Sequence, residues 1–296
     1  MMRVLVTGGQ GQLARCLADA AAGDAALDMV FAARPDFDLG RVAAARDHVI
    51  AARPDIIVNA AAYTAVDKAE SEPELAFAIN RDGAAAMAEA ADKLGVPIIH
   101  LSTDYVFSGE KNGAYVETDS VAPMGVYGHS KLAGEHAVAH STKRHLIVRT
   151  AWVYSAYGAN FVKTMMRLGR DRTELRVVDD QTGNPTSAHD LATTILAMCK
   201  QADNGNNAWG TYHAAGQGDV TWHGFAKQIF ATLESLGHAI PKLTAITTRD
   251  YPTPAKRPAN SRLDCAKLNE NFGLALPDWK PSTAKVVSRL LAERGT

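Results

Sequence analysis

The chain has 296 residues, a hydrophobic content of 47% and a formal net charge of −1. This length suggests one large or two smaller domains with a full core, and the near-neutral charge argues against nucleic acid and membrane surfaces as partners. No apolar stretch reaches the ~18 residues that span a bilayer, and the N-terminus lacks a signal-peptide layout, so we expect a cytoplasmic protein. The scattered Cys16, Cys199 and Cys265 predict neither a disulfide framework nor a metal site.

A short apolar strand is predicted over residues 3–7, followed by a glycine-rich turn and a helix to about residue 22. In the turn, Gly8, Gly11 and Ala14 form a G-x-x-G-x-x-A pattern. Glycine lets backbone amides approach a pyrophosphate, and the N-terminus of the helix supplies the positive end of its dipole. The pattern therefore predicts a dinucleotide-binding turn; a plain strand-to-helix turn is the alternative.

A second strand is predicted over residues 29–33, at whose end a cofactor with a free ribose 2′-hydroxyl usually meets an acidic residue. This chain has Arg34 there, and an arginine suits a 2′-phosphate. NADPH is therefore favoured over NADH, the alternative being that Arg34 is a solvated loop residue. Asp38 and Leu39 open the next helix and are expected to lie along the adenine.

A third strand over residues 55–59 is followed by small residues, which leave room for a cofactor at its carboxyl end. A long helix is predicted over about residues 73–94, and its Asn80 suggests a capping or structural role. The alternation of strands and helices through residue 150 predicts an α/β protein: a Rossmann-type, doubly wound parallel sheet with helices on both faces.

Two pairs of polar residues surround the next predicted elements. Ser102 and Thr103 follow an apolar strand over residues 96–101, and Tyr127 and Lys131 lie four apart on a helix, hence on one face. A phenol has a pKa near ~10, and a lysine cation one turn away lowers it. Together with a hydroxyl that holds a carbonyl oxygen, these groups suit protonation of that oxygen as hydride reaches its carbon. Alone, Tyr-x-x-x-Lys is a weak motif and also fits an exposed helix pair.

After a strand over residues 145–149 the chain leaves the sheet, and helices are predicted over about 160–170 and 188–200. Residues 251–264 form a proline-punctuated run with three cations, which suits a diphosphate clamp or a solvated basic loop. The predicted domains are a dinucleotide-binding domain of residues 1–152 plus about 171–213, and a smaller C-terminal α/β substrate domain of about 153–170 plus 214–296.

Several runs in this order resemble the extended short-chain dehydrogenase/reductase family, across nearly the whole chain. They are VNAAAYTAVDKAE (58–70), STDYVFSG (102–109), VYGHSKLAGE (126–135), RTAWVY (149–154) and RPANSRL (257–263). Within that family the resemblance implies NADPH- or NADH-dependent reduction of the C4 ketone of dTDP-4-dehydro-L-rhamnose. The product, dTDP-L-rhamnose, would feed rhamnose-containing surface polysaccharides such as the O-antigen of lipopolysaccharide.

The resemblance also implies roles for single residues. Tyr127 would donate the proton to the C4 oxygen, Lys131 would bind the nicotinamide ribose and lower the pKa of Tyr127, and Thr103 would hydrogen-bond the same oxygen. The cofactor-binding residues it implies, with those from the turn and the second strand, are Gly8, Gly11, Gln12, Leu13, Arg34, Asp38, Leu39, Ala62, Tyr63, Thr64, Tyr127 and Lys131. The substrate-binding residues are Thr103, Asp104 and Trp152, with Gln181 and Arg257 added by location only.

Two departures from relatives are informative. Sugar-nucleotide 4,6-dehydratases carry Asp-Glu directly after the catalytic Thr, whereas this chain has Asp104 and Tyr105, so elimination of water is disfavoured. Some relatives form dimers bridged by Mg²⁺ through glutamates, one of them in the first helix. This chain has Arg15 and Cys16 there, so a bridging Mg²⁺ is not expected, and the protein is predicted to be a monomer or a homodimer.

Two alternatives remain. One is a reductase of another nucleotide-linked 4-keto sugar. The other is a non-catalytic binding subunit, like the regulatory beta subunit of methionine adenosyltransferase, which also resembles this family. The presence of Thr103, Tyr127 and Lys131 together argues against a non-catalytic role.

Overall fold

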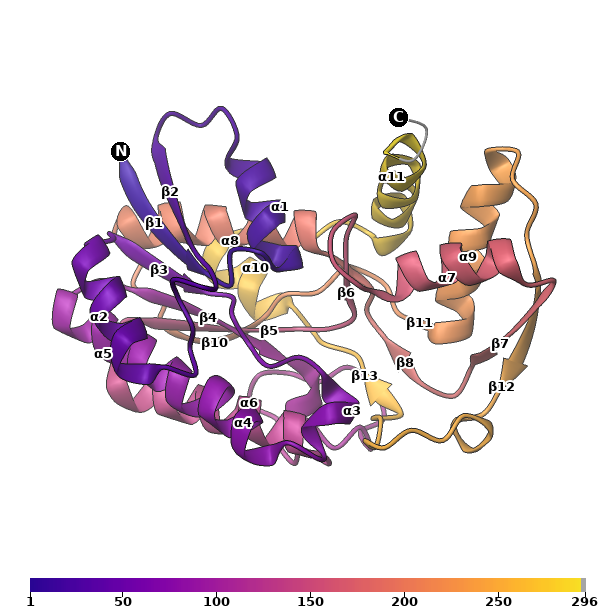
Figure 1. Ribbon diagram of the computed structural model, residues 1–296, viewed down its shortest axis with the longest axis horizontal. Coiled ribbons are helices and arrows are strands. Elements are labelled where there is room, and N and C mark those ends of the chain that lie inside the picture. Colours follow the sequence, from indigo (N-terminus) through magenta and orange to yellow (C-terminus); the bar gives the residue numbers. More distant parts are fainter. Residues whose placement is uncertain (294–296) are drawn as a thin grey trace.

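Six parallel strands form the central sheet of the computed structural model, which describes residues 1–293 (Figure 1). Their order is β10-β5-β4-β3-β1-β2. The chain turns to opposite sides of β1 at β2 and β3, and such a switch point opens a crevice at the carboxyl ends of the strands. The predicted Rossmann-type sheet is confirmed. The strands are β1 (Met2–Thr7), β2 (Leu27–Ala32), β3 (Ile56–Asn59), β4 (Ile98–Thr103), β5 (His145–Thr150) and β10 (Gly210–His213).

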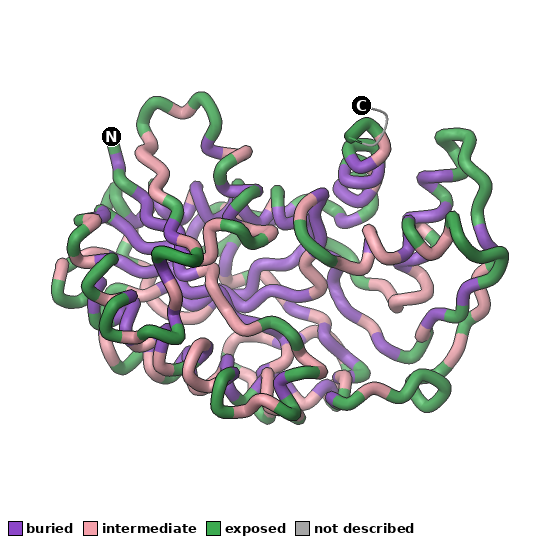
Figure 2. The backbone as a smooth tube through the Cα atoms, in the orientation of Figure 1, coloured by how far each residue is buried: buried purple, intermediate pink, exposed green. Residues whose placement is uncertain are grey.

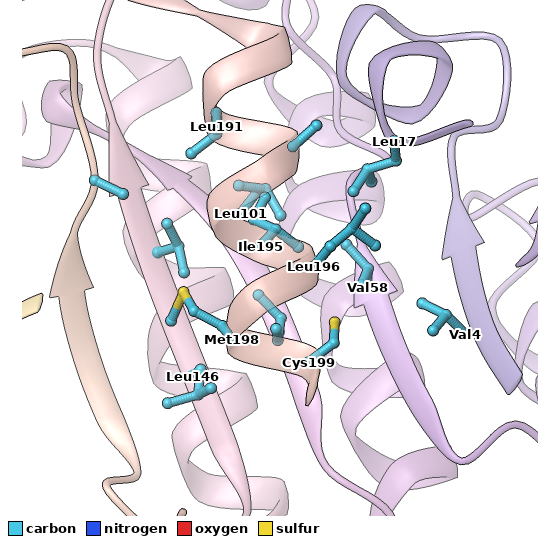
Figure 3. Packing of buried hydrophobic residues seen from close by; sticks show 14 of the residues in the cluster. Val4, Leu17, Val58, Leu101, Leu146, Leu191, Ile195, Leu196, Met198 and Cys199 are labelled. Atoms are coloured by element: carbon cyan, nitrogen blue, oxygen red, sulfur yellow. The ribbon is translucent and has the colours of Figure 1, made fainter. Parts of the chain in front are cut away.

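Helices cover both faces of this sheet. One face packs against α1 (Gln12–Ala21), α8 (Ala188–Asp203) and α10 (Ala266–Phe272), with Leu17, Ile195 and Leu268 in the core. Figure 3 shows α8 lying over the sheet, with Leu191, Ile195 and Met198 directed at the strands. The other face packs against α2 (Val42–Ala52), α5 (Ala84–Leu94) and α6 (Val126–Ser141).

The central strands are buried on both faces (Figure 2), as expected for a parallel sheet that helices cover on each side. Every residue of β4 is buried, including His100, Ser102 and Thr103. Polar side chains in such strands need partners within the protein, because water does not reach them.

The long helix predicted over residues 73–94 is divided in the structure. It consists of α4 (Pro73–Phe77), a π-helical segment η1 (Ala78–Gly83) and α5. Asn80 lies in the π-helical segment, accepts a hydrogen bond from Tyr63 N at 2.8 Å and donates to Ser130 Oγ at 2.9 Å. π-helical turns are rare, occur mostly inside α-helices and are frequent at functional sites. Asn80 therefore connects the segment after β3 to α6, which confirms its predicted structural role.

A smaller α/β lobe lies beside the sheet (Figure 1). Its core contains Tyr154, Phe225, Phe230 and Trp279. Three small sheets, β12-β7, β11-β8-β13 and β6-β9, complete it. Its elements are β6 (Val153–Tyr154), α7 (Phe161–Asp171), β7 (Glu174–Val178), β8 (Thr182–Gly183), β9 (Thr186–Ser187), β11 (Val220–Thr221), α9 (Trp222–Ser235), β12 (Lys242–Ile246), the 3-10 helix η3 (Thr248–Asp250), β13 (Asn260–Ser261) and α11 (Trp279–Ala292).

The range 171–213, which the sequence assigns to the dinucleotide-binding domain, divides between the two lobes. Within it, α8 packs on the large sheet and β10 forms its edge, whereas β7 pairs with β12 in the smaller lobe. Residues 174–178 therefore pair with an element outside the predicted dinucleotide-binding range. Five register pairs between residues 174–178 and 242–246 hold β7 there, a long-range pairing that the local sequence pattern does not reveal.

Candidate active site

A cavity of about 1190 Å³ opens at the carboxyl ends of β1, β3 and β4, beside the switch point of the sheet. The site residues predicted from the sequence that line it are Gly8, Gly11, Gln12, Leu13, Arg34, Asp38, Leu39, Ala62, Tyr63, Thr64, Thr103, Asp104, Tyr127, Lys131 and Trp152. Ligand pockets usually measure about 300–1,000 Å³, so this cavity has room for a dinucleotide and part of a second ligand.

The glycine-rich turn suits a dinucleotide. Gly8 has φ +73°, and a Cβ there would lie 2.9 Å from Ala61 Cα, so the position requires glycine. Gly11 is the N-cap of α1 and no side chain caps this helix end, so its first N–H groups face the cavity without a side-chain acceptor. Such N–H groups bind phosphate. The cationic side chains of Arg34 and Arg41 lie farther along the same wall.

Thr103 and Tyr127 face the same part of the cavity. The Thr103 hydroxyl donates to Asp104 Oδ1 at 3.0 Å and accepts from Tyr105 N at 3.2 Å. Burial raises the pKa of Tyr127 to about 12; the Thr103 hydroxyl opposes this shift and the Asp104 charge adds to it. The ring of Tyr105 packs edge-on against Tyr127, with centroids 5.5 Å apart. At neutral pH Tyr127 therefore holds its proton and can act as an acid.

Lys131 is only 2% exposed, and its Nζ donates to Leu101 O at 2.6 Å. Burial lowers the pKa of Lys131 to about 8, although the charge of Glu135 opposes the shift. The sequence predicts that Lys131 lowers the pKa of Tyr127. In the structure the loss of water around the phenol has the larger effect, so the pKa of Tyr127 is raised overall, and the Lys131 amine donates to a backbone carbonyl.

Two oxygen atoms of the cavity wall are buried without a hydrogen-bond partner among the described residues, Asp104 Oδ2 and Thr150 Oγ1. Burial raises the pKa of Asp104 to about 6, and hydrogen bonds from Ser261 and Thr103 oppose that shift. Buried polar atoms normally have partners. A ligand with hydroxyl groups, such as a sugar, would provide them here.

An aromatic pair closes another side of the cavity. Trp152 stacks on Trp222 of α9 with centroids 3.5 Å apart and an angle of 8° between the planes. The backbone of Trp152 has φ +48°, which is rare and costly for a large side chain. A Cβ on Gly183 would lie 2.5 Å from the Trp152 ring. The fold thus holds this indole in one place despite the backbone cost.

Gln181 and Arg257 are not among the described residues that line the cavity. Gln181 donates to Thr248 Oγ1 at 2.9 Å within the smaller lobe. Arg257 pairs with Asp67 of α3 (Val66–Ala69) at 2.7 Å, and its Nη1 is buried without a partner among the described residues. Tyr105, which lines the cavity, is close enough to Arg257 for the guanidinium charge to act on its pKa. Arg257 is therefore close to the cavity, and Gln181 lies in the smaller lobe outside the lining.

The sequence analysis missed a buried ion pair beneath the site. Arg149 of β5 donates from Nε and Nη2 to Glu135 of α6 at 2.9 and 2.7 Å, and Ser102 Oγ also donates to this carboxylate. Both charged side chains are nearly inaccessible. Glu135 lies one turn after Lys131, a spacing that would have indicated a shared helix face. The pair connects the helix that carries Tyr127 and Lys131 to the strand beside Thr103.

Within residues 1–293, no group of three or more His, Cys, Asp and Glu side chains is arranged to hold a metal ion. None of the helices in this range is both long and apolar enough to cross a membrane.

The model of the RmlD substrate binding domain family matches residues 2–292. The chain belongs to this family. Among proteins similar to this RmlD-family chain, a dTDP-4-dehydrorhamnose reductase of Sinorhizobium fredii is 49% identical over 294 residues, 99% of each chain.

Solved structures of the same kind superpose closely on this RmlD-family chain. A dTDP-4-dehydrorhamnose reductase of Clostridium acetobutylicum has a TM-score of 0.91 at 38% identity, and the match covers 98% of this chain and 100% of that one. The reductase of Bacillus anthracis, solved in complex with NADP, has a TM-score of 0.88 at 36% identity, with 99% of each chain covered.

Proposed function

We propose that this protein reduces the C4 ketone of dTDP-4-dehydro-L-rhamnose with NADPH, forming dTDP-L-rhamnose. The observation that carries the proposal is that Thr103, Tyr127 and Lys131 line the same cavity as the Gly8–Leu13 turn. A dinucleotide site and a proton donor thus share one cavity, as hydride transfer to a ketone requires. The reductases named among its relatives act on the same sugar nucleotide.

In the proposed mechanism the cavity orients the ketone and supplies a proton. Bound NADPH supplies the hydride that adds to C4. Tyr127 donates its phenolic proton to the C4 oxygen, and the raised pKa keeps this phenol protonated until then. Thr103 hydrogen-bonds the same oxygen, which requires its hydroxyl to leave Asp104 Oδ1. The cation of Lys131, one turn from Tyr127, stabilises the phenolate that remains.

For the cofactor, we propose that the α1 N-terminus with Gly11, Gln12 and Leu13 binds the pyrophosphate and that Arg34 binds the 2′-phosphate. NADH is the second candidate cofactor; it has no 2′-phosphate and so offers Arg34 no partner. The remaining proposed contacts are Gly8, Asp38, Leu39, Ala62, Tyr63, Thr64, Tyr127 and Lys131, all in the cavity wall.

For the sugar nucleotide, we propose that Asp104 and Trp152 contact the sugar and that Arg257 binds the diphosphate. The buried Asp104 Oδ2 and Arg257 Nη1 atoms, without partners among the described residues, support both contacts. Gln181 is a further proposed contact to the thymidine diphosphate part of the substrate. Tyr105 occupies the place of the dehydratase base and has no carboxylate, so reduction is favoured over elimination of water.

The two lobes suit the binding of two different ligands. We propose a dinucleotide-binding domain around the six-stranded sheet and a substrate domain around the cluster of Tyr154, Phe225 and Trp279, with β7 in the latter. One chain contributes all the proposed contacts, so the active unit is a monomer or one subunit of a homodimer. Because NADPH and nucleotide-linked sugars are cytoplasmic metabolites, we also propose a cytoplasmic location.

The test is oxidation of NADPH by the purified protein with dTDP-4-dehydro-L-rhamnose, followed by absorbance, with NADH and with other nucleotide-linked 4-keto sugars for comparison. Tyr127→Phe is expected to lower kcat by about a hundredfold to ten-thousandfold, because the acid is lost. Tyr251→Phe, at a tyrosine 60% exposed outside the cavity, is the matched control.

Loss of turnover in Tyr127→Phe with unchanged NADPH binding would establish the reaction and its acid. Turnover with only a different 4-keto sugar would assign the protein to that substrate. No turnover with any of them, by folded protein that binds NADPH, would contradict the enzymatic proposal and favour a non-catalytic binding role.

A further inference from the structure

Three polar side chains cross the central sheet beneath the cavity. Thr7 of β1, Asn59 of β3 and His100 of β4 are register partners on neighbouring strands, so they lie side by side on one face. The Thr7 hydroxyl donates to Asn59 Oδ1 at 2.7 Å, and Asn59 Nδ2 lies 2.9 Å from His100 Nδ1. All three are at most 1% exposed. We call these three residues the polar ladder.

The polar ladder ends at the lysine of the cavity. His100 Nε2 lies 3.5 Å from Lys131 Nζ, which also donates to Leu101 O. The imidazole and the backbone carbonyl of the next residue thus hold the amine from two directions. Because the apolar core surrounds these groups, each contact is stronger than it would be in water.

The hydrogen bonds of the polar ladder determine where the imidazole proton lies. Ala61 N donates to Thr7 Oγ1 at 3.1 Å, so that oxygen accepts once and directs its own proton to Asn59 Oδ1. Asn59 Nδ2 must then donate to His100 Nδ1, and a neutral imidazole with an acceptor at Nδ1 carries its proton at Nε2. An N–H group therefore points at Lys131 Nζ. An N–H is a partner for the lone pair of a neutral amine and repels an ammonium ion.

We propose that His100 is a positioning residue for Lys131, which it holds in the cavity and, through Nε2–H, biases toward the neutral amine. The inference rests on the proposed function, in which the charge of Lys131 assists Tyr127. His100 itself remains neutral, because burial and the nearby Lys131 charge hold its pKa well below the usual range. Burial alone lowers the pKa of Lys131 to about 8, and the bias from Nε2–H would act in the same direction.

Other charged and titratable groups face Lys131 from the elements around it. Glu135, one turn farther along α6, favours the ammonium, but Arg149 of β5 neutralises much of its charge through two hydrogen bonds. Tyr127 lies one turn earlier on α6 and stays neutral over the physiological range. His100 from β4 therefore differs from these groups: it is neutral, and it can shift the pKa of Lys131 without placing a charge beside it.

The proposal predicts where turnover falls on the alkaline side. If the ammonium is the active form, kcat decreases as the pH rises through about 8, where Lys131 loses its proton. The His100→Phe substitution removes the Nε2–H group while it keeps a ring of similar shape. The alkaline decrease is then expected to move up by about one pH unit, because the ammonium is no longer repelled.

A second pair of variants tests the proton placement without changing His100. Thr7→Val removes the hydroxyl that orients the Asn59 amide, so the amide can turn and let His100 accept at Nε2. The alkaline decrease is expected to move up in Thr7→Val and to stay in place in Thr7→Ser, which keeps the hydroxyl. This pair decides the question even if the His100 variant does not fold.

The pH dependence of kcat for the sugar and the pH dependence of NADPH affinity are measured for all four proteins. The proposal is overturned if the alkaline decrease of kcat stays at the same pH or moves to lower pH in His100→Phe. It is also overturned if this decrease lies at the same pH in Thr7→Val and Thr7→Ser. If the wild type has no turnover, the proposed function fails. The same shifts in the pH dependence of NADPH affinity then still test the effect of His100 on Lys131.

Discussion

Arg257 and Asp67 form an ion pair between the two lobes, with Nη2 and Oδ2 2.7 Å apart across 190 positions of sequence. Arg257 precedes β13 in the smaller lobe. Asp67 belongs to α3, and the residues on either side of it, Val66 and Lys68, line the cavity. The carboxylate takes one side of the guanidinium, and the buried Nη1 on the other side has no partner among the described residues. Asp67 thus orients the cation that we propose for the diphosphate.

Substitution of Arg257 by Gln is expected to raise KM for the sugar nucleotide about tenfold or more while kcat changes little, because a charge-assisted contact to the diphosphate is lost. Arg249→Gln, in η3 on the same segment, is the control for a general loss of positive charge. Steady-state kinetics with NADPH held saturating measure both constants. Equal increases of KM in the two variants would contradict a specific role for Arg257.

Substitution of Arg34 by Gln is expected to raise KM for NADPH about tenfold and to leave KM for NADH nearly unchanged, because only NADPH carries the 2′-phosphate. Arg46→Gln on α2 is the matched control, since Arg46 pairs with Glu89 and does not line the cavity. The comparison needs both cofactors at one ionic strength. A similar loss with NADH would show that Arg34 acts on the shared part of the two cofactors.

Asp104 is expected to make stability depend on pH. Its pKa is raised from 3.8 to about 6, so between these values the folded protein holds the proton more tightly than the unfolded chain. Stability is therefore lost as the pH rises through this window, by up to about 3 kcal/mol, and the Asp104→Asn variant lacks this loss.

The measurement for Asp104 is urea unfolding of both proteins at about pH 4 and about pH 7. Relative to the wild type, the free energy of unfolding of the variant should be higher at about pH 7 than at about pH 4. A constant difference at the two pH values would mean that Asp104 titrates normally in the folded protein. Since Asp104 is proposed to contact the sugar, the variant should also have a raised KM.

The buried pair of Glu135 and Arg149 predicts a large cost for removal of one partner. Glu135→Gln should reduce the free energy of unfolding by about 3–5 kcal/mol, because the buried guanidinium loses its counter-ion. Glu89→Gln removes the exposed contact with Arg46 and should cost less than about 1 kcal/mol. Denaturant unfolding measures both values, and similar costs would refute a special role for the buried pair.

Much of the site follows from local patterns of the sequence. The strand and turn around Gly8, the hydroxyl of Thr103 at a strand end, and the four-residue spacing of Tyr127 and Lys131 each depend on neighbours within one or two elements. Such patterns are governed by backbone geometry and hydrophobic periodicity, which short stretches of chain already express. The parallel sheet and the wall of the cavity could be predicted for the same reason.

Tertiary structure alone decided which distant side chains meet and what charge they carry. The contacts of His100 with Lys131, of Glu135 with Arg149 and of Arg257 with Asp67 join residues 31, 14 and 190 positions apart. Packing also moved β7 into the smaller lobe. Burial, a property of the whole fold, raised the pKa of Tyr127 where the local Tyr–Lys spacing predicted a decrease. Water is removed from a side chain only when several elements cover it, and no local pattern records that event.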